Sequence, residues 1–162
     1  MEPKAKMSTL VLGLGNPILG DDGVGWKVAE EVQSRIAALG ISAEVDFASL
    51  GGLSLMERML GYSRVVLIDC METGRAQVGT VHVLLLGELE DPMAGHSASA
   101  HDASLITALQ AAQALGADVP SRVDVVTIEA KISYDFTEQL SPEIAAAVPL
   151  ATQAVIKLLA TI

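Results

Sequence analysis

The stretch LVLGLGNPILGDDGVGWKVAEEV, residues 10 to 32, holds the features that decide the fold. An apolar run ends in the glycines of residues 13–15 and an amphipathic helix pattern follows, as in a buried strand that turns sharply into a helix. The turn looks like one that binds a nucleotide, but Ile18 stands where a third glycine would approach a phosphate. Asp21 and Asp22 would repel a phosphate, so these two carboxylates need another explanation.

The rest of the chain alternates between strand and helix patterns. We expect strands at 9–15, 42–50, 64–70, 79–87 and 121–130, and helices at 23–40, 53–61, 101–116 and 141–162. This alternation favours a three-layer α/β/α sandwich with a mostly parallel twisted sheet covered on both faces. Because no long helix precedes the strand at 79–87, we expect that strand to be antiparallel at an edge.

Composition limits the classes of function. The 162 residues, about half of them apolar, predict a single domain spanning 1–162. A formal net charge of −10 disfavours nucleic acid and anionic membrane surfaces as partners. A lone cysteine and an N-terminus without a signal-peptide pattern predict a cytoplasmic protein. The apolar C-terminal stretch is interrupted by Pro149, Gln153 and Lys157, which favours a core helix over a membrane span.

Polar residues stand where the chain leaves a strand or enters a helix. Asp21 and Asp22 follow the first strand, Asp69 ends the strand at 64–70, and His101 opens a helix. Ligands of open α/β sheets bind at the carboxyl ends of the strands, so we expect these side chains to converge. Each also has a purely structural explanation: a helix cap for Asp21 or Asp22, a turn for Asp69 and a helix start for His101.

Convergence of these side chains predicts a divalent metal. Closely packed carboxylates repel each other unless a cation or a shared proton is present. A helix N-terminus disfavours imidazolium, which keeps His101 neutral and able to donate its lone pair to a metal. Two or three carboxylates and one imidazole differ from a closed structural zinc site, which uses four, usually sulfur-rich, ligands. The open positions point to catalysis or to metal recognition.

Four stretches resemble successive blocks of the hydrogenase maturation proteases. These endopeptidases remove a C-terminal tail from the large subunit of nickel-containing hydrogenases. The blocks run in order over about residues 9–158 and are LGLGNPILGDDGVG, SLGGLSLMERMLGYSRVVLIDCMETG, SAHDASL and ISYDFTEQLSPEIAAAV.

The resemblance implies a role for particular residues. Asp22, Asp69 and His101 match the metal-binding and catalytic positions of the family, and Asp21 is an acidic neighbour whose role is open. The implied partner is a hydrogenase large-subunit precursor, which carries the nickel to the site. Cys70 stands where a small residue such as alanine is usual, and IEAK lacks the proline expected after the last strand.

Two other functions fit parts of the sequence. Peptidyl-tRNA hydrolases carry GLGNP after an N-terminal strand, but they follow it with a histidine-containing stretch and a basic surface, unlike this acidic chain. A non-catalytic chaperone that binds nickel or the immature subunit stays open, because no nucleophile stands out. Ser97, Ser99 and Ser104 near His101 lie in no nucleophile-elbow motif, and the thiol of Cys70 stands beside a carboxylate that raises its pKa.

Overall fold

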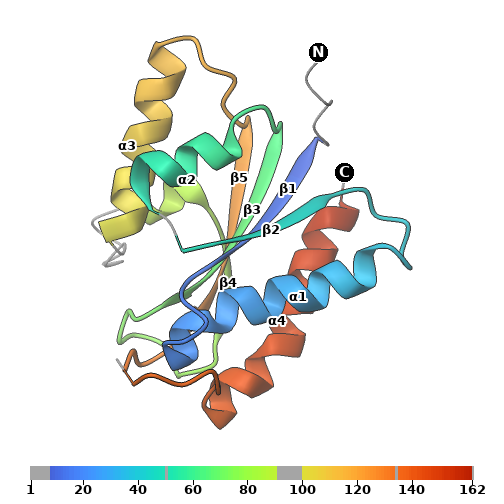
Figure 1. The fold of residues 1–162 in the computed structure, drawn as a ribbon, viewed down its shortest axis with the longest axis vertical. Coiled ribbons are helices and arrows are strands. Elements are labelled where there is room, and N and C mark those ends of the chain that lie inside the picture. The colour runs from blue at the N-terminus through green and yellow to red at the C-terminus, as the bar shows by residue number, and fades with distance from the viewer. Residues whose placement is uncertain (1–7, 50, 91–99, 134, 162) are drawn as a thin grey trace.

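The computed structural model describes residues 8–49, 51–90, 100–133 and 135–161. Every expected strand and helix is present (Figure 1). The elements are β1 (Thr9–Leu14), η1 (Gly20–Gly23), α1 (Val24–Ile36), β2 (Glu44–Ala48), α2 (Gly52–Met59), β3 (Arg64–Met71), β4 (Val81–Leu85), η2 (Leu86–Glu90), α3 (Ala100–Ala114), β5 (Arg122–Glu129) and α4 (Pro142–Ala160).

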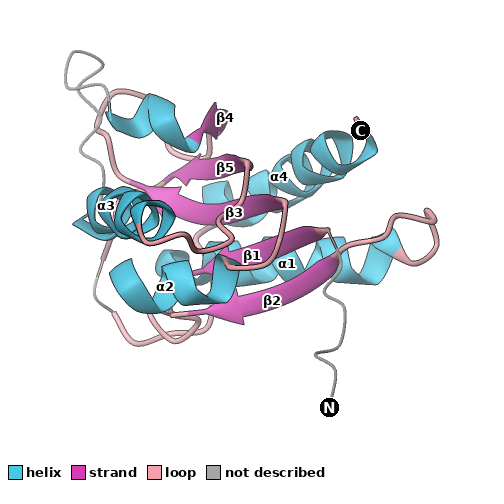
Figure 2. Cartoon of the chain, turned by 90° about the horizontal axis from the view of Figure 1, so that it is seen from above, coloured by secondary structure: helices cyan, strands magenta, loops and turns pink. Residues whose placement is uncertain are grey.

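The strands form one five-stranded sheet in the order β2-β1-β3-β5-β4. β1 pairs in parallel with β2 and β3, β3 pairs in parallel with β5, and β4 is antiparallel to β5 at the edge. Figure 2 shows the strands stacked in this order, with α2 and α3 on one side of the sheet and α1 and α4 on the other. The predicted three-layer α/β/α sandwich with an antiparallel edge strand is confirmed.

Both faces of the central strands β1, β3 and β5 are buried, which explains the apolar runs in these strands. Alternate residues of a strand point to opposite faces. In β3, Leu67 therefore joins the core cluster beneath α2 and α3, whereas Ile68 joins the cluster beneath α1 and α4.

The glycines of the opening stretch allow close packing where β1 gives way to α1. A Cβ on Gly25 would lie 2.3 Å from the backbone oxygen of Leu14 and 2.4 Å from that of Ile68, so only glycine fits against the strand ends. Gly15 has φ +124°, and a Cβ there would lie 1.9 Å from the backbone oxygen of Asp22. Because these glycines lack a side chain, the turn that contains η1 can pack closely against the carboxyl ends of β1 and β3.

The helix expected to end at Gly40 stops earlier as an α-helix, at Ile36. The chain then turns, and the N–H of Ile41 donates to the backbone oxygen of Ile36 at 3.0 Å. Gly40 has φ +68°, which favours glycine and places it as the residue that reverses the chain after the helix.

The helix α4 is a core helix, as predicted. By length and composition it could cross a membrane, but core helices of soluble proteins pass the same test. Its buried residues Ile144, Ala147, Ala151, Val155 and Leu159 share a core cluster with apolar residues of α1 and the sheet.

Candidate active site

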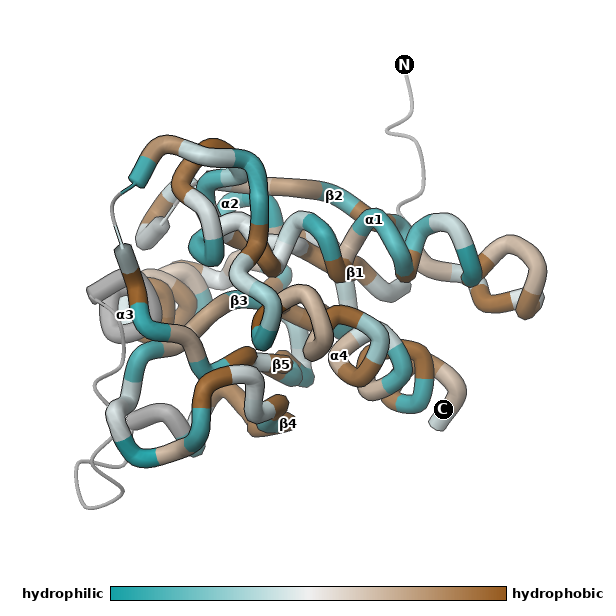
Figure 3. Tube along the Cα trace, turned by 90° about the horizontal axis from the view of Figure 1, so that it is seen from below, coloured by the Kyte–Doolittle hydropathy of each residue, from teal (hydrophilic) through white to brown (hydrophobic). Residues whose placement is uncertain are grey.

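The candidate site lies where the parallel strands end. Asp22 belongs to η1, directly after the loop that leaves β1, and Asp69 lies near the end of β3. Figure 3 views the molecule from this end and shows hydrophilic segments alternating with hydrophobic ones along the loops. Because β1 and β3 are parallel neighbours, their carboxyl ends bring these two acids to the same edge of the sheet.

Asp22 is held by two neutral donors. Its Oδ2 accepts the backbone N–H of Asn16 at 2.9 Å, and its Oδ1 lies 3.6 Å from Sγ of Cys70. The N-cap of α1 is Gly23, which has no side-chain cap, so Asp22 does not cap this helix. The structural explanation that the sequence left open for Asp22 is therefore wrong.

Asp69 contacts the backbone of the same cysteine. Its Oδ1 accepts the backbone N–H of Cys70 at 2.8 Å, and its side chain is only partly buried. Strand alternation places Asp69 on the face of α2 and α3 and Cys70 on the face of α1 and α4. The two carboxylates thus contact Cys70 at its amide and at its thiol, and their joint role in one metal site stays a prediction.

The thiol of Cys70 is poorly suited to act as a nucleophile. Burial raises its pKa strongly, and the charges of Asp69 and Asp22 raise it further. The group stays protonated at neutral pH and donates to Asp22. Cys70 therefore acts as a small buried side chain, in keeping with the expectation that the neighbouring carboxylate raises the pKa of its thiol.

Asp21 has a structural role. Its Oδ1 accepts the backbone N–H of Ser141, and its Oδ2 accepts the hydroxyl of Ser141, both at 2.8 Å. Ser141 is the N-cap of α4, and the N–H of Gly20 donates to the backbone oxygen of Thr137 at 2.8 Å. Asp21 therefore fastens the segment before α4 to η1 and so positions Asp22.

The backbone of His101 lies in the first turn of α3, whereas its side chain lies outside what the structure describes. Figure 1 shows α3 joined by its last turn to the start of β5, so its first turn lies toward the opposite end of that strand. Ser97 and Ser99 lie outside the described residues.

Two of the three predicted metal ligands, Asp22 and Asp69, have side chains that the structure describes. Among the side chains that the structure describes, no three of His, Cys, Asp or Glu gather closely enough to hold one. Asp22 and Asp69 offer carboxylate oxygens of the kind that bind divalent metals, and both contact Cys70. The assignment of His101 as a third ligand stays a prediction.

Glu129 is a buried carboxylate that the sequence analysis missed. It ends β5 with 2% of its surface exposed, and it accepts the backbone N–H of Thr73 at 2.9 Å as well as the Thr73 hydroxyl. Burial raises its pKa, but hydrogen bonds from Thr73 and the backbone of Ala76 outweigh burial and lower it overall. The sequence does contain a signal for Glu129: it ends the apolar strand RVDVVTIE, just as Asp69 follows the apolar residues of its own strand.

Comparison with known proteins identifies the family. Residues 26–158, more than half of the chain, match the family HycI, described as hydrogenase maturation protease. The chain belongs to the hydrogenase maturation protease family. It is accordingly a peptide-bond hydrolase, a hydrogenase maturation endopeptidase, and this disfavours the peptidyl-tRNA hydrolase alternative.

Solved structures of maturation proteases share the fold. The hydrogenase maturating endopeptidase HybD from E. coli superposes with a TM-score of 0.73 at 23% identity, over 94% of this chain and 92% of that chain. The [NiFe] hydrogenase maturation protease HybD from Thermococcus kodakarensis gives a TM-score of 0.67 at 26% identity, over 94% and 99%. The hydrogenase 2 maturation peptidase from Thaumarchaeota archaeon SCGC_AB-539-E09 gives 0.60 at 25% identity, over 93% and 97%. No curated protein matches the chain.

Proposed function

We propose that this maturation protease removes the C-terminal tail of a hydrogenase large-subunit precursor that already carries nickel. Asp22, Asp69 and His101 bind the nickel, which arrives with the precursor and is part of the substrate. The protein acts in the cytoplasm as one domain spanning 1–162, in keeping with its acidic charge and its lone cysteine.

The observation that best supports this proposal is that the carboxylates of Asp22 and Asp69 both contact Cys70. Oδ1 of Asp22 lies 3.6 Å from its Sγ, and Oδ1 of Asp69 lies 2.8 Å from its N. The donors to Asp22 are a backbone N–H and a thiol, so its negative charge is not neutralised within this contact. Such a pair of acids suits a cation brought by a partner.

The residues of the site then have distinct tasks. Asp22 and Asp69 supply oxygen ligands, and His101, in the first turn of α3, supplies nitrogen. Bound nickel supplies a positive charge near the peptide carbonyl and fixes the position of the bond to be cut. Asp21 keeps η1 fastened to Ser141, so that the carboxylate of Asp22 stays in place.

The test uses one precursor in two forms, with and without inserted nickel, at matched enzyme concentration. Mass spectrometry over time follows the loss of the tail. We expect cleavage of the nickel-loaded form alone, because without nickel the ligands of enzyme and precursor share no ion. Equal rates for the two forms would contradict the role of nickel. An unchanged mass of both forms would favour a chaperone that binds the precursor without cutting it.

A further inference from the structure

Two exposed apolar residues lie side by side next to the candidate active site. Phe136 is 83% exposed and Ile18 is 47% exposed. The N–H of Thr137 donates to the backbone oxygen of Ile18 at 2.9 Å, and the N–H of Gly20 donates to that of Thr137 at 2.8 Å. These bonds hold the segment before α4 against the loop that leads into η1. We call the exposed pair of Ile18 and Phe136 the apolar rim.

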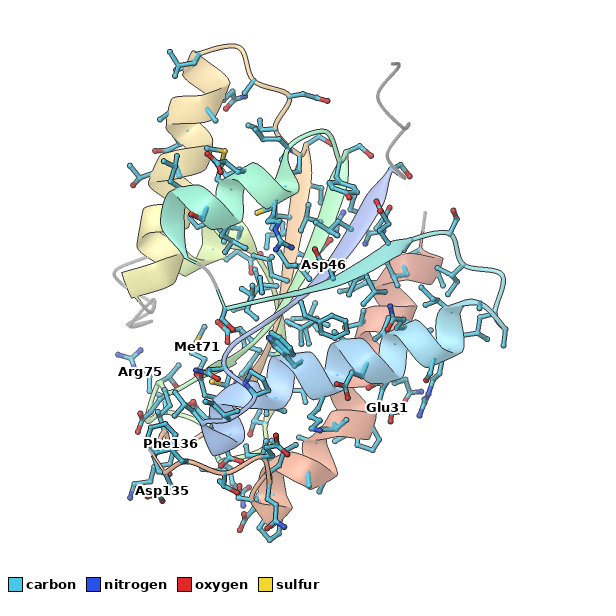
Figure 4. The ribbon with its side chains drawn as sticks, viewed as in Figure 1. Glu31, Asp46, Met71, Arg75, Asp135 and Phe136 are labelled. Atoms are coloured by element: carbon cyan, nitrogen blue, oxygen red, sulfur yellow. The ribbon has the colours of Figure 1, made fainter. Side chains whose placement is uncertain are left out.

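Hydrogen bonds also connect the apolar rim to Asp22. The backbone N–H of Asn16 donates to Oδ2 of Asp22 at 2.9 Å, and Oδ1 of Asn16 accepts the N–H of Ile18 at 3.2 Å. Asn16 therefore contacts both the proposed metal ligand and the rim. Figure 4 shows Phe136 at the same end of the molecule as Met71, which ends β3. The rim and the proposed ligands thus belong to one end of the sheet.

The exposure of Phe136 does not serve the fold. The chain has two phenylalanines, and the other, Phe47, packs against Trp26 with ring centroids 5.3 Å apart. A phenylalanine in water contributes no apolar burial to folding, whereas a covered aromatic side chain buries about 150–250 Å². Aromatic residues are accordingly enriched in the cores of protein interfaces. Phe136 therefore has the character of a contact residue for another protein.

The size of a protein interface indicates what covers the rim. Hydrogenase maturation proteases act on a protein, the hydrogenase large-subunit precursor. A specific interface buries about 800 Å² on each partner, which corresponds to a disc of about 16 Å radius. Ile18 is four residues from Asp22, so the two lie within about 14 Å of each other. An interface centred on Asp22 therefore includes Ile18 and the neighbouring Phe136.

We propose that the apolar rim is a docking surface for an apolar patch of the large-subunit precursor. The inference rests on the proposed function, which brings the precursor to Asp22. Asp135 and Glu138 are exposed within two residues of Phe136, so an acidic surface would be repelled there. The part of the precursor that fits is apolar and free of acidic side chains. The rim binds this patch whether or not nickel is present, and nickel adds the ligands of the cleavage site.

The experiment measures docking and cutting separately. Calorimetry gives the Kd of a nickel-free precursor, which the proposed function leaves uncut, and mass spectrometry gives kcat and KM for the nickel-loaded form. We expect Phe136→Ala to raise both Kd and KM by about tenfold and to leave kcat within about twofold, because docking contacts are made equally before and during the reaction.

Two further variants make this comparison specific. Phe136→Leu keeps an apolar side chain and should recover most of the lost affinity. Leu115→Ala is the matched control, since Leu115 is 88% exposed but lies between α3 and β5, and its Kd and KM should equal those of the wild type. The melting temperatures of all three variants should stay within about 2 °C of the wild type, because exposed side chains contribute little to stability.

A Kd or a KM that Phe136→Ala leaves unchanged would overturn the docking surface, and so would an equal loss of affinity in Leu115→Ala. A wild-type dimer that Phe136→Ala separates in sedimentation, with precursor affinity unchanged, would identify a second copy of the chain as the occupant and overturn it too. Failure of the wild type to cut the nickel-loaded precursor would overturn the proposed function alone, if Phe136→Ala still weakens precursor binding and Leu115→Ala does not.

Discussion

Asp124 and Asp22, which lie at opposite ends of the sheet, have different hydrogen-bond partners. At the end where the parallel strands begin, Asp124 is 1% exposed and is paired with Arg64 at 3.3 Å and with Arg122 at 3.0 Å. At the end where they finish, Asp22 receives hydrogen bonds from a backbone N–H and a thiol. The first end contains its own cations, whereas the carboxylate of Asp22 is held by neutral donors.

The difference separates acids that stabilise the fold from acids that serve chemistry. Arg64 and Arg122 are Cα partners on neighbouring strands, and Asp124 offsets the repulsion between them. Neutral donors orient Asp22 but leave its charge for a ligand. Substitutions at the two ends should therefore affect different properties.

The largest effect is expected for Asp22→Asn, Asp69→Asn and His101→Ala. Each should slow processing of a nickel-loaded precursor by about a hundredfold or more, since each removes a proposed ligand. The melting temperature should change by only a few degrees, about 3 °C or less, because polar residues at the edge of the sheet contribute little to the core. Processing is followed by mass spectrometry. Full activity in a folded variant would remove that residue from the site.

Asp124→Asn should show the opposite behaviour. Loss of its charge leaves Arg64 and Arg122 side by side, and we expect a loss of about 3 kcal/mol in the free energy of unfolding. Processing should stay within about twofold at a temperature where the variant is folded. Urea denaturation measures the first quantity. Asp46→Asn is the control, since Asp46 forms an exposed pair with Arg58 that should contribute about 0.5 kcal/mol.

The pH dependence of stability provides a test of the role of Glu129. Its pKa in the folded protein lies below the ordinary value of 4.5, so the folded state favours the ionised form. Its stabilising contribution is fully present above about pH 4.5 and is lost as the pH falls through the folded-state pKa. The difference in unfolding free energy between wild type and Glu129→Gln should thus shrink below pH 4.5. A difference that is constant with pH would show that Glu129 does not titrate as described.

The smallest effect is expected for Cys70→Ser. Serine keeps a donor toward Asp22, and the buried thiol of Cys70 is not activated as a nucleophile. Processing should stay within about threefold of wild type, and thiol-directed reagents should not inhibit the enzyme. Complete loss of cleavage in a stably folded variant would instead identify Cys70 as the nucleophile.

Local patterns were enough to select the acids of the candidate site. Paired acids after the first strand and an acid closing an apolar run marked Asp22 and Asp69, because parallel strands must end at the same edge. The distinction between Asp21 and Asp22 could not be predicted in this way. It depends on Ser141, which lies 120 residues further along the chain and meets Asp21 only after α4 has packed.

The sequence by itself determined the order of strands and helices, the antiparallel edge strand and the family, because periodicity, turn residues and motifs are local properties of the chain. Only the tertiary structure decided which acids are neutralised and which cavities remain. Asp124 and Glu129 look alike as single acids in an apolar strand, yet one pairs with two arginines and the other with Thr73. The hydroxyl of Thr127, which has no hydrogen-bond partner among the described residues, is likewise a product of packing, since the burial and pairing of a polar atom depend on residues brought together across the sheet.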